Sequence, residues 1–226
     1  MGINEIYAEA VRKVYEEGIE TSPRGMKVKE LLGHTLVSDP NDNIITITGL
    51  QTNVDYAREE LEWYRSGSNR IDWSPRIQRV WSRYSDDGKT INSNYGTRIF
   101  GHYEKAPFNQ WEWVKNKLKE DPDSRQALMN INDVFDKETP TKDFPCTVSL
   151  QVLLRENKLH WITTMRSNDI FLGYRNDMFC FTELQKQLAA ELGVDAGDYI
   201  HFASSLHLYE KDFERARTVE KSKIYK

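Results

Sequence analysis

A cysteine held beside a proline is the first residue in this sequence that could carry out covalent chemistry. Cys146 follows Pro145 at the start of an apolar stretch that predicts a β-strand. A thiolate is a strong nucleophile, and it persists near neutral pH only where cationic groups stabilise it. A lone cysteine is also typical of a small, buried core residue. The residues that surround Cys146 in the fold therefore decide between the two interpretations.

An arginine and a serine follow the next predicted strand and supply the groups that a phosphate requires. Arg166 and Ser167 come directly after an apolar stretch that ends at Met165. A guanidinium group can donate to two phosphate oxygens, and a hydroxyl adds a third donor. The same arginine would stabilise a neighbouring thiolate. An exposed ion pair is the alternative interpretation of Arg166 by itself.

The elements that must position these residues follow from the hydrophobic periodicity. Helices are expected from an Asn4 cap to Gly18, over 54–65, over 108–119, over 176–192, and after residue 208. Strands are expected over 27–37, 44–48, 146–153, 159–165 and 199–208, with a hairpin turn at 155–158. Strands and helices do not alternate strictly, so we expect an α+β fold with a large sheet rather than a doubly wound fold.

The composition limits the kinds of protein that this chain can be. Its 226 residues favour one large domain over 1–226. A formal net charge of −4 argues against a protein that binds nucleic acid directly. No apolar run approaches the length of a membrane span, and no cysteine or histidine spacing indicates a zinc site. Two cysteines and an acidic, amphipathic N-terminal segment favour a reducing cytoplasm.

Seven short motifs occur in the order in which they are found in one enzyme superfamily. In the first half of the chain they are Glu60-Leu61-x-Trp63 with Gly67, Trp81, Tyr95-Gly96, and Asp121-Pro122-Asp123-Ser124-Arg125. In the second half they are Pro145-Cys146, Arg166-Ser167-x-Asp169 with Phe171-Leu172-Gly173, and His207-x-Tyr209. With these motifs the chain resembles the thymidylate synthase superfamily over nearly its whole length. The resemblance implies a single domain of that fold, with a large mixed sheet flanked by helices, and a homodimer formed through the sheet.

The residue that reads the base distinguishes the branches of this superfamily. Thymidylate synthases have an asparagine four residues after the glycine of Phe-Leu-Gly, whereas this chain has Asp177 four residues after Gly173. The segments around Glu60, Arg166 and Asp177 most resemble the deoxycytidylate hydroxymethylases of large bacteriophages. There are two alternatives: Asp177 is only a helix cap, or Asn176 is the residue that reads the base, which would then be uracil.

Hydrogen-bond matching independently supports a cytosine base. Cytosine presents a 4-amino donor and a bare ring nitrogen, which a carboxyl group satisfies with one shared proton. Uracil presents a ring N–H and a 4-oxo group, which an amide satisfies with its oxygen and its NH₂ group. An ionised Asp177 facing the 4-oxo group would bring two acceptors together, at a cost of about 1–3 kcal/mol or more.

The resemblance also implies the reaction and the roles of the catalytic residues. Addition of the Cys146 thiolate to carbon 6 makes carbon 5 of the base nucleophilic. Carbon 5 then takes a one-carbon unit from 5,10-methylenetetrahydrofolate, and water adds to give 5-hydroxymethyl-dCMP and tetrahydrofolate. Glu60 would organise water and proton transfers around the base, and Asp177 would read it. The reaction implies no metal.

The remaining contacts implied by the resemblance are shared among the nucleotide, the folate and the partner subunit. The phosphate is assigned to Arg166 and Ser167, the sugar hydroxyl to His207 and Tyr209, and the folate pteridine to Asp169 and Trp81. Arg125 is expected to reach the partner's phosphate, although Gln126 stands where the family has a second arginine. Arg24 resembles the family's mobile arginine loop, with a different glycine spacing.

Three alternatives remain open at the level of the sequence. The nearest is a relative that uses dUMP, either a thymidylate synthase or a hydroxymethylase. The second is a catalytically silent nucleotide-binding protein of the same fold, against which Cys146, Glu60 and Arg166 argue. The third is a cysteine hydrolase that pairs Cys146 with His160 or His207, for which the sequence has no supporting motif.

Overall fold

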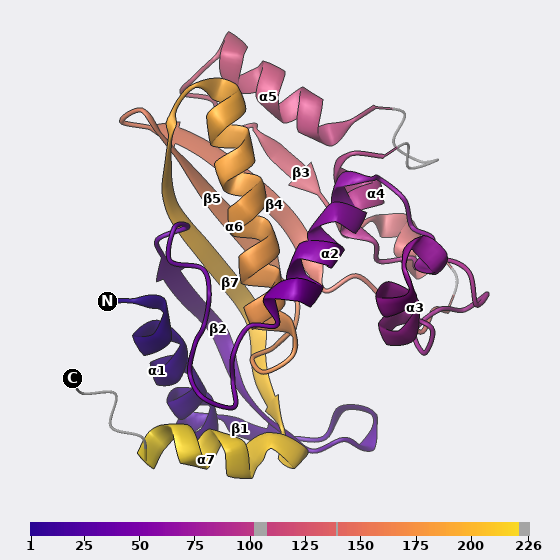
Figure 1. Ribbon diagram of the computed structural model, residues 1–226, viewed down its shortest axis with the longest axis vertical. Helices are drawn as coiled ribbons and strands as arrows, with labels where there is room; N and C mark the ends of the chain where they lie inside the picture. The colour runs from indigo at the N-terminus through magenta and orange to yellow at the C-terminus, as the bar shows by residue number, and fades with distance from the viewer. Residues whose placement is uncertain (102–107, 139, 222–226) are drawn as a thin grey trace.

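One mixed sheet organises the chain in the computed structural model, which describes residues 1–101, 108–138 and 140–221 (Figure 1). Its strands are β1 (Ile19–Thr21), β2 (Val28–Ser38), β3 (Leu128–Asn130), β4 (Thr147–Arg155), β5 (Lys158–Met165), β6 (Asn168–Asp169) and β7 (Asp195–Tyr209). The strand order is β1-β2-β7-β5-β4-β3, and β6 pairs with β7. β5 and β6 run parallel to β7, whereas the other pairs are antiparallel. The expected α+β fold with a large mixed sheet flanked by helices is confirmed.

The described residues form seven α-helices, which flank the sheet or pack on one another. They are α1 (Ile3–Glu17), α2 (Val54–Arg65), α3 (Pro75–Trp81), α4 (Tyr95–Ile99), α5 (Gln110–Glu120), α6 (Gly173–Leu192) and α7 (Phe213–Lys221). Short 3₁₀ turns occupy 23–25, 71–73, 134–137 and 210–212. Of the helices that the structure describes, none combines the length and the hydrophobicity needed to cross a bilayer.

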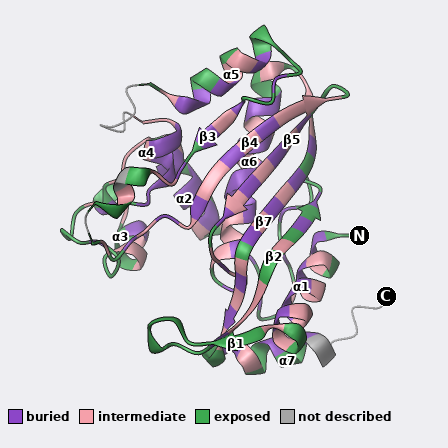
Figure 2. Ribbon diagram, turned by 180° about the vertical axis from the view of Figure 1, so that it is seen from behind, coloured by how far each residue is buried: buried purple, intermediate pink, exposed green. Residues whose placement is uncertain are grey.

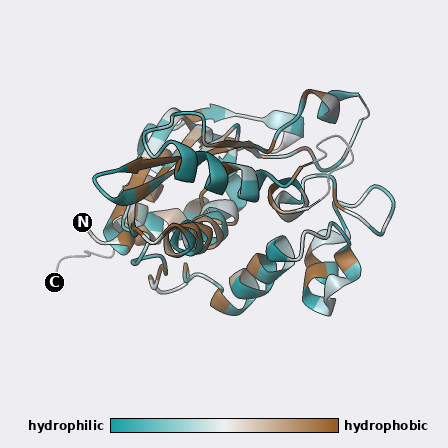
Figure 3. Cartoon of the chain, turned by 90° about the horizontal axis from the view of Figure 1, so that it is seen from above, coloured by the Kyte–Doolittle hydropathy of each residue, from teal (hydrophilic) through white to brown (hydrophobic). Residues whose placement is uncertain are grey.

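The long helix α6 covers one face of the sheet, and no helix covers the central strands on the other face. Along β5 the residues Leu159, Trp161, Thr163 and Met165 are buried, and the residues between them are only partly buried. This alternation places every second side chain of β5 against α6, because successive side chains of a strand point to opposite faces of the sheet. Figure 2 shows the central strands from behind, with α6 beyond them and no helix in front of them. Figure 3 shows hydrophilic and hydrophobic residues alternating along the outer helices, which is typical of helices that pack on a core by one side.

The β4–β5 hairpin forms where the sequence predicts it. Glu156 and Asn157 have positive φ angles of 50° and 59°, which is the backbone of a two-residue type I′ turn. This turn pairs Arg155 with Lys158 at one end of the hairpin and Thr147 with Met165 at the other. The register therefore fixes which residues meet at the open end of the hairpin.

Two expected features of the N-terminal third are wrong. The first helix begins at Ile3 with Gly2 as its cap, and not at an Asn4 cap; the Gly2 N–H donates to the Glu5 carboxylate at 3.1 Å. Asn4 instead accepts from the Thr46 N–H at 2.9 Å. The strand expected over 44–48 is a loop, because side chains satisfy its backbone groups in place of a strand partner.

The stretch between α2 and α5 contains helices that the sequence pattern did not predict. α3 and α4 have only seven and five residues, so both are shorter than the window of about 11–18 residues over which hydrophobic periodicity is recognised. Ser74 and Asn94 cap them by accepting backbone N–H groups at 3.1 Å and 2.8 Å. Most of the other predicted helices and strands form close to their expected bounds.

The fold predicts that Gly96 cannot be replaced by alanine without loss of stability. A Cβ at Gly96 would overlap the backbone of Tyr64, where α4 crosses α2. The backbone of a helix cannot move aside like a side chain, so Gly96→Ala should lower the free energy of unfolding by about 1–3 kcal/mol. Urea titration measures the change. Gly2→Ala is the control, because its Cβ would meet only the Asp42 carboxylate at 3.4 Å. Equal effects of the two substitutions would contradict the close contact between α4 and α2.

Candidate active site

The open end of the β4–β5 hairpin brings the cysteine and the arginine together. Cys146 lies just before β4 and Arg166 just after β5, and the Arg166 N–H donates to the Cys146 carbonyl at 2.8 Å. One guanidinium nitrogen of Arg166, Nη2, lies 3.5 Å from the Cys146 sulfur. The structure thus joins the two groups that the sequence separates by 20 positions.

Two carbonyl oxygens fix the Arg166 guanidinium in this position. Its Nε donates to the Pro145 carbonyl at 2.8 Å, and its Nη2 donates to the Phe144 carbonyl at 2.9 Å. The group also lies 5.1 Å from the centre of the Phe144 ring. The remaining nitrogen, Nη1, has no hydrogen bond among the described residues and is available to an anion.

Opposing charges act on the Cys146 thiol. Burial raises its pKa, and the carboxyl groups of Asp177 and Asp143 raise it further, whereas Arg166 and Arg24 lower it. The net pKa is above the usual value of a cysteine, so the thiol form is favoured in the chain alone. A proton on Asp177 would remove one of the nearby negative charges and move the balance towards the thiolate.

Glu60 is a buried carboxyl group at the contact between α2 and α6. Only 2% of its surface is exposed. Its Oε1 accepts from the Tyr56 hydroxyl at 2.9 Å, and its Oε2 accepts from the Asn176 amide. Burial raises the pKa of Glu60 to about 7, although these donors act in the opposite direction. A carboxyl group with this pKa can both take and give a proton near neutral pH.

Asp177 lies in the second turn of α6, facing the same region. Its Oδ2 accepts from the Asn168 amide at 2.7 Å. Burial raises the pKa of Asp177 to about 7; the Asn168 donor lowers it, and the charges of Glu60 and Asp169 raise it further. Gly173 leaves room for this contact, because a Cβ there would lie 2.9 Å from the Asn168 nitrogen and 3.2 Å from Asp177 Oδ2.

The structure corrects the interpretation of Asp177 as a helix cap. α6 begins at Gly173, so Asp177 is an interior residue of the helix. Asp169 supplies the local hydrogen bonds instead, since its Oδ1 accepts the N–H groups of Phe171 and Leu172 at 2.8 Å and 3.2 Å. The amide nitrogen of the neighbouring Asn176 is engaged by Glu60.

The residues expected to hold the nucleotide sugar and phosphate lie on adjacent elements. Ser167 Oγ is 3.5 Å from His207 Nδ1, and the rings of His207 and Tyr209 are 5.2 Å apart. Burial and the charge of Asp169 raise the pKa of Tyr209, whereas Arg24 lowers it by its charge and by a hydrogen bond. Arg24 has a φ of 54°, a left-handed conformation that an arginine rarely adopts. From its exposed loop the Arg24 side chain reaches Tyr209, and its charge acts on Cys146.

Asp169 and Trp81 offer the two kinds of contact that a folate pteridine would require. Asp169 Oδ2 is buried and has no hydrogen-bond partner among the described residues, so it can accept an N–H group of a bound heterocycle. Trp81 is partly exposed, and its ring lies 5.7 Å from that of Trp63. Its indole N–H donates to Tyr56 at 3.0 Å, so the ring face rather than the N–H is left for a ligand. These two residues fit the expected group.

Two residues named from the sequence lie away from Cys146. The Arg125 carbonyl accepts from Gln151 at 3.0 Å, and Gln151 is five positions along β4, or about 17 Å, from Cys146. Arg125 is exposed there, and its expected role in a partner's site stays a prediction. His160 pairs with Leu153 and accepts from the Asp198 N–H at 3.1 Å, about 24 Å from Cys146. The second histidine, His207, faces Ser167, so neither forms the pair that a cysteine hydrolase requires.

Two side chains at the site were not identified from the sequence. Tyr56 precedes Glu60 by one helical turn, and Asn168 stands between Ser167 and Asp169. The i, i+4 spacing within the predicted helix over 54–65 was a signal that could have indicated Tyr56. Asn168 had no such signal, because only the packing of α6 brings it to Asp177.

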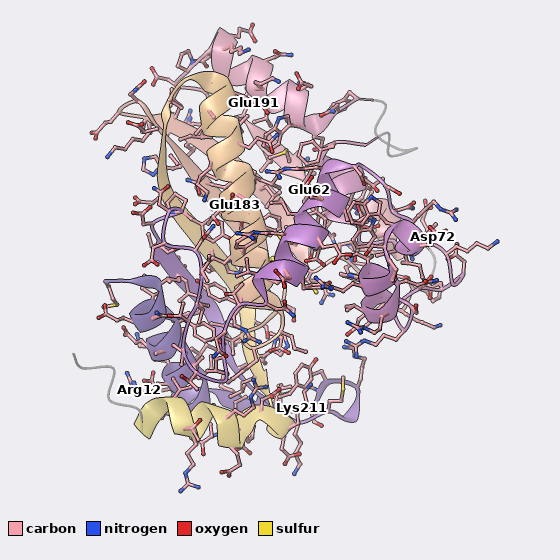
Figure 4. The ribbon with its side chains drawn as sticks, viewed as in Figure 1. Arg12, Glu62, Asp72, Glu183, Glu191 and Lys211 are labelled. Atoms are coloured by element: carbon pink, nitrogen blue, oxygen red, sulfur yellow. The ribbon has the colours of Figure 1, made fainter. Side chains whose placement is uncertain are left out.

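Neighbouring features complete the surroundings of the site. Arg65 connects α2 to α6 by donating to Glu62 at 2.6 Å and to Gln187 at 3.0 Å; Glu62 on α2 is labelled in Figure 4.

A surface cavity of about 370 Å³ lies between α2 and α3 and is lined by Glu59, Pro75, Arg76 and Arg79. None of the candidate site residues lines it. In the part of the chain that the structure describes, no three histidine, cysteine or carboxylate side chains are grouped to hold a metal ion.

Comparison with known proteins identifies relatives of the whole site region. A family model described as thymidylate synthase matches residues 5–225. The chain is 31% identical over 232 residues to the deoxyuridylate hydroxymethyltransferase of Bacillus phage SP01, covering 98% of this chain and 61% of that protein. It is 29% identical over 226 residues to the deoxycytidylate 5-hydroxymethyltransferases of Enterobacteria phages T4 and T2, covering 94% of this chain and 88% of each. The chain thus spans about three fifths of the SP01 protein. It belongs to the thymidylate synthase family.

Proposed function

We propose that this chain transfers a one-carbon unit from 5,10-methylenetetrahydrofolate to carbon 5 of dCMP, with addition of water, in the cytoplasm. The products are 5-hydroxymethyl-dCMP and tetrahydrofolate, which would supply a precursor of modified DNA. The observation that carries the choice of base is the carboxyl group of Asp177, with a pKa of about 7, beside Glu60. The named relatives include both a deoxyuridylate and a deoxycytidylate enzyme, so family membership alone does not decide the base.

The state of the Asp177 carboxyl group suits a cytosine. Its Oδ2 already accepts the Asn168 N–H, so Oδ2 is an acceptor and any proton resides on Oδ1. A proton shared between Oδ1 and the bare ring nitrogen would leave an oxygen to accept from the 4-amino group. With a pKa near 7, the carboxyl group can hold that proton at physiological pH.

The second candidate is dUMP, which the similarity to the SP01 enzyme favours. Asn176 has the amide that a uracil requires, but its nitrogen donates to Glu60. Incubation with methylenetetrahydrofolate and either dCMP or dUMP, followed by mass spectrometry of the product, decides between the two bases. The same measurement distinguishes a hydroxymethyl from a methyl product.

The chain's own residues account for activation of the base. Nη1 of Arg166 and the hydroxyl of Ser167 would hold the phosphate, and His207 and Tyr209 the sugar hydroxyl. The Cys146 sulfur would add to carbon 6, and the electron pair of the ring double bond would move to carbon 5. A proton on Asp177 removes a nearby negative charge, which lowers the pKa of the Cys146 thiol as the base binds.

In the proposed reaction, different residues position the folate and the water. The bound folate would supply the one-carbon unit, with Asp169 Oδ2 accepting from its pteridine and Trp81 against its ring. Glu60 would take the proton that leaves carbon 5 and orient the water that adds at the end. This assignment makes Glu60 the general base and Cys146 the nucleophile.

We further propose a homodimer formed through the uncovered face of the sheet. Val37 on β2 is 49% exposed there, and Ile162, Ile200 and Phe202 on β5 and β7 are only partly buried. A second copy would cover this apolar face. In such a dimer Arg125, which lies far from its own chain's Cys146, could reach the partner's phosphate site.

The substitution Cys146→Ser separates the role of Cys146 in turnover from its role in substrate binding. The hydroxyl keeps the shape of the site but is a far weaker nucleophile, so turnover should fall by at least roughly 10³-fold while dCMP binding changes little. Calorimetry measures the binding, and product mass measures the turnover. Cys180→Ser is the control, since Cys180 is fully buried in the core. Substantial turnover by the Cys146 variant would exclude covalent catalysis.

The base reader can be tested by Asp177→Asn. An amide replaces a protonatable acceptor with a fixed acceptor and donor, so use of dCMP should weaken and use of dUMP should rise. The reversal involves two hydrogen bonds. The difference in activation free energy between dCMP and dUMP, measured by the ratio of their kcat/KM values, should therefore change by about 2–4 kcal/mol. If this variant keeps its preference for dCMP while Asn176→Ala loses it, then Asn176 is the base reader.

The pH dependence gives a second measure of the same substitution. The proton on Asp177 is lost above its pKa of about 7, so kcat/KM for dCMP should fall on the alkaline side. Glu60 must be ionised to act as a base, so the rate should also fall below its pKa of about 7. Asp177→Asn should remove the alkaline limb and keep the acidic limb.

Subunit mixing tests the role of Arg125 in the partner's site. Arg125→Ala and Cys146→Ser subunits should each form poorly active homodimers, since each lacks one group of every site. A mixed dimer would rebuild one site with both groups, so mixing should restore up to about half of the activity per heterodimer. Activity after subunit exchange is the measurement. The absence of any recovery would show that Arg125 acts within its own chain or not at all.

A further inference from the structure

Tyr56 occupies the position between the buried Glu60 carboxyl group and Trp81. Its hydroxyl donates to Glu60 Oε1 at 2.9 Å and accepts from the Trp81 indole N–H at 3.0 Å. Tyr56 precedes Glu60 by one turn of α2, so the helix itself sets their spacing. The hydroxyl thus links the base end of the site to the end at which Trp81 would meet the folate.

The two oxygens of Glu60 are not equivalent. Oε2 accepts from the Asn176 amide, and an NH₂ group can only donate. Oε1 accepts from a hydroxyl, which can turn its hydrogen away and become an acceptor instead. A proton that reaches Glu60 can therefore be accommodated on Oε1 and cannot be accommodated on Oε2 without loss of the Asn176 hydrogen bond.

The lone pairs of the Tyr56 oxygen allow this reversal. A phenol oxygen has one hydrogen and can accept two hydrogen bonds. The Trp81 N–H uses one acceptor position, so the second remains free for a protonated Glu60 Oε1. When the hydrogen bond reverses, the hydrogen of Tyr56 points away from Glu60. Glu60 is 2% exposed, whereas Tyr56 is partly exposed, so this direction can lead towards solvent.

Several other groups face Glu60 and contribute to its titration. Tyr64 from α2 and Trp81 from α3 turn polar hydrogens towards it and lower its pKa, as Tyr56 and Asn176 do. The charge of Glu60 in turn raises the pKa of Asp177 and of Cys180, both on α6. Of the groups that donate to Glu60, the hydroxyls of Tyr56 and Tyr64 can reverse their direction, whereas the Asn176 NH₂ and the Trp81 N–H can only donate. Tyr64 is buried and Tyr56 is partly exposed, so Tyr56 is the hydroxyl that can pass a proton outward.

We propose that Tyr56 is the positioning residue that relays protons between Glu60 Oε1 and solvent during the hydroxymethylation. This inference rests on the proposed role of Glu60 as the general base. In one direction Glu60 passes its proton to the Tyr56 oxygen as Tyr56 releases its own hydrogen towards solvent; in the other direction both transfers reverse. No net charge remains on Tyr56, and Glu60 returns to the ionised form for the next turnover.

The relay is tested by Tyr56→Phe, which removes the hydroxyl and keeps the ring. Loss of a donor to the ionised carboxyl group should raise the pKa of Glu60 by about one pH unit or more. ¹³C NMR of side-chain-labelled glutamate follows this titration, and Glu60→Gln assigns the signal. The acidic limb of the kcat profile should move to higher pH by the same amount. kcat should fall by roughly 10- to 100-fold with little change in the KM for dCMP.

Chemical rescue distinguishes a relay from a structural role. Imidazole in the buffer should restore part of the turnover of Tyr56→Phe and leave the wild type unchanged, because a small base can carry the missing proton. Tyr15→Phe is the matched control: Tyr15 lies on α1, where its ring contacts Phe213 and Lys29, and its loss should change none of these quantities.

Two results would overturn the relay. One is an unchanged pKa of Glu60 in Tyr56→Phe, which would mean that the hydroxyl does not stabilise the ionised form. The other is a lowered kcat that imidazole does not restore, which would leave Tyr56 with a structural role alone. If the wild-type protein makes no hydroxymethyl product, the proposed function is wrong. The NMR titration would still show whether the Tyr56 hydroxyl changes the pKa of Glu60.

Discussion

A carboxyl group that is almost completely buried is the constraint on which this site depends. Glu60 is placed by α2 against α6, where 2% of its surface is exposed. An isolated ionised carboxylate at such a place would cost several kcal/mol, so donors must surround it. They come from three elements: Tyr56 from its own helix, Asn176 from α6, and Trp81 through Tyr56. The packing of α2 on α6 is therefore what assembles the hydrogen bonds around this carboxyl group.

Electrostatic coupling connects the acid–base groups with the nucleophile. Glu60 raises the pKa of Asp177, and Asp177 in turn raises that of Cys146. Protonation of one group thus changes the charge state that its neighbours prefer, and the apparent pKa values belong to the cluster as a whole. A base that brings a proton to Asp177 would at the same time favour the thiolate. Under the proposed roles of Asp177 and Cys146, recognition of the base would then be coupled to activation of the thiol.

Local patterns were sufficient to predict the parts of the fold that local forces determine. The turn at 155–158 and the alternation on either side of it placed the β4–β5 hairpin, and with it the meeting of Cys146 and Arg166. The loop at 44–48 was mistaken for a strand, because its apolar residues alternate while its backbone bonds to side chains far away in the sequence. The contact of Asn168 with Asp177 was equally beyond local reasoning, since it exists only once α6 has docked beside β6. The order of the family motifs supplied the site residues that periodicity could not.

The Asn168–Asp177 hydrogen bond has a consequence for the evolution of base preference. Asn168 donates to one oxygen of the side chain at 177, and an asparagine amide offers an oxygen of the same size at the same place. Gly173 leaves room for either group, since carboxyl and amide are nearly isosteric. A single codon change at this position would keep the Asn168 donor paired, and the new amide NH₂ would face the base. Under the proposed role of residue 177, a change of pyrimidine preference would then need no change in how α6 packs.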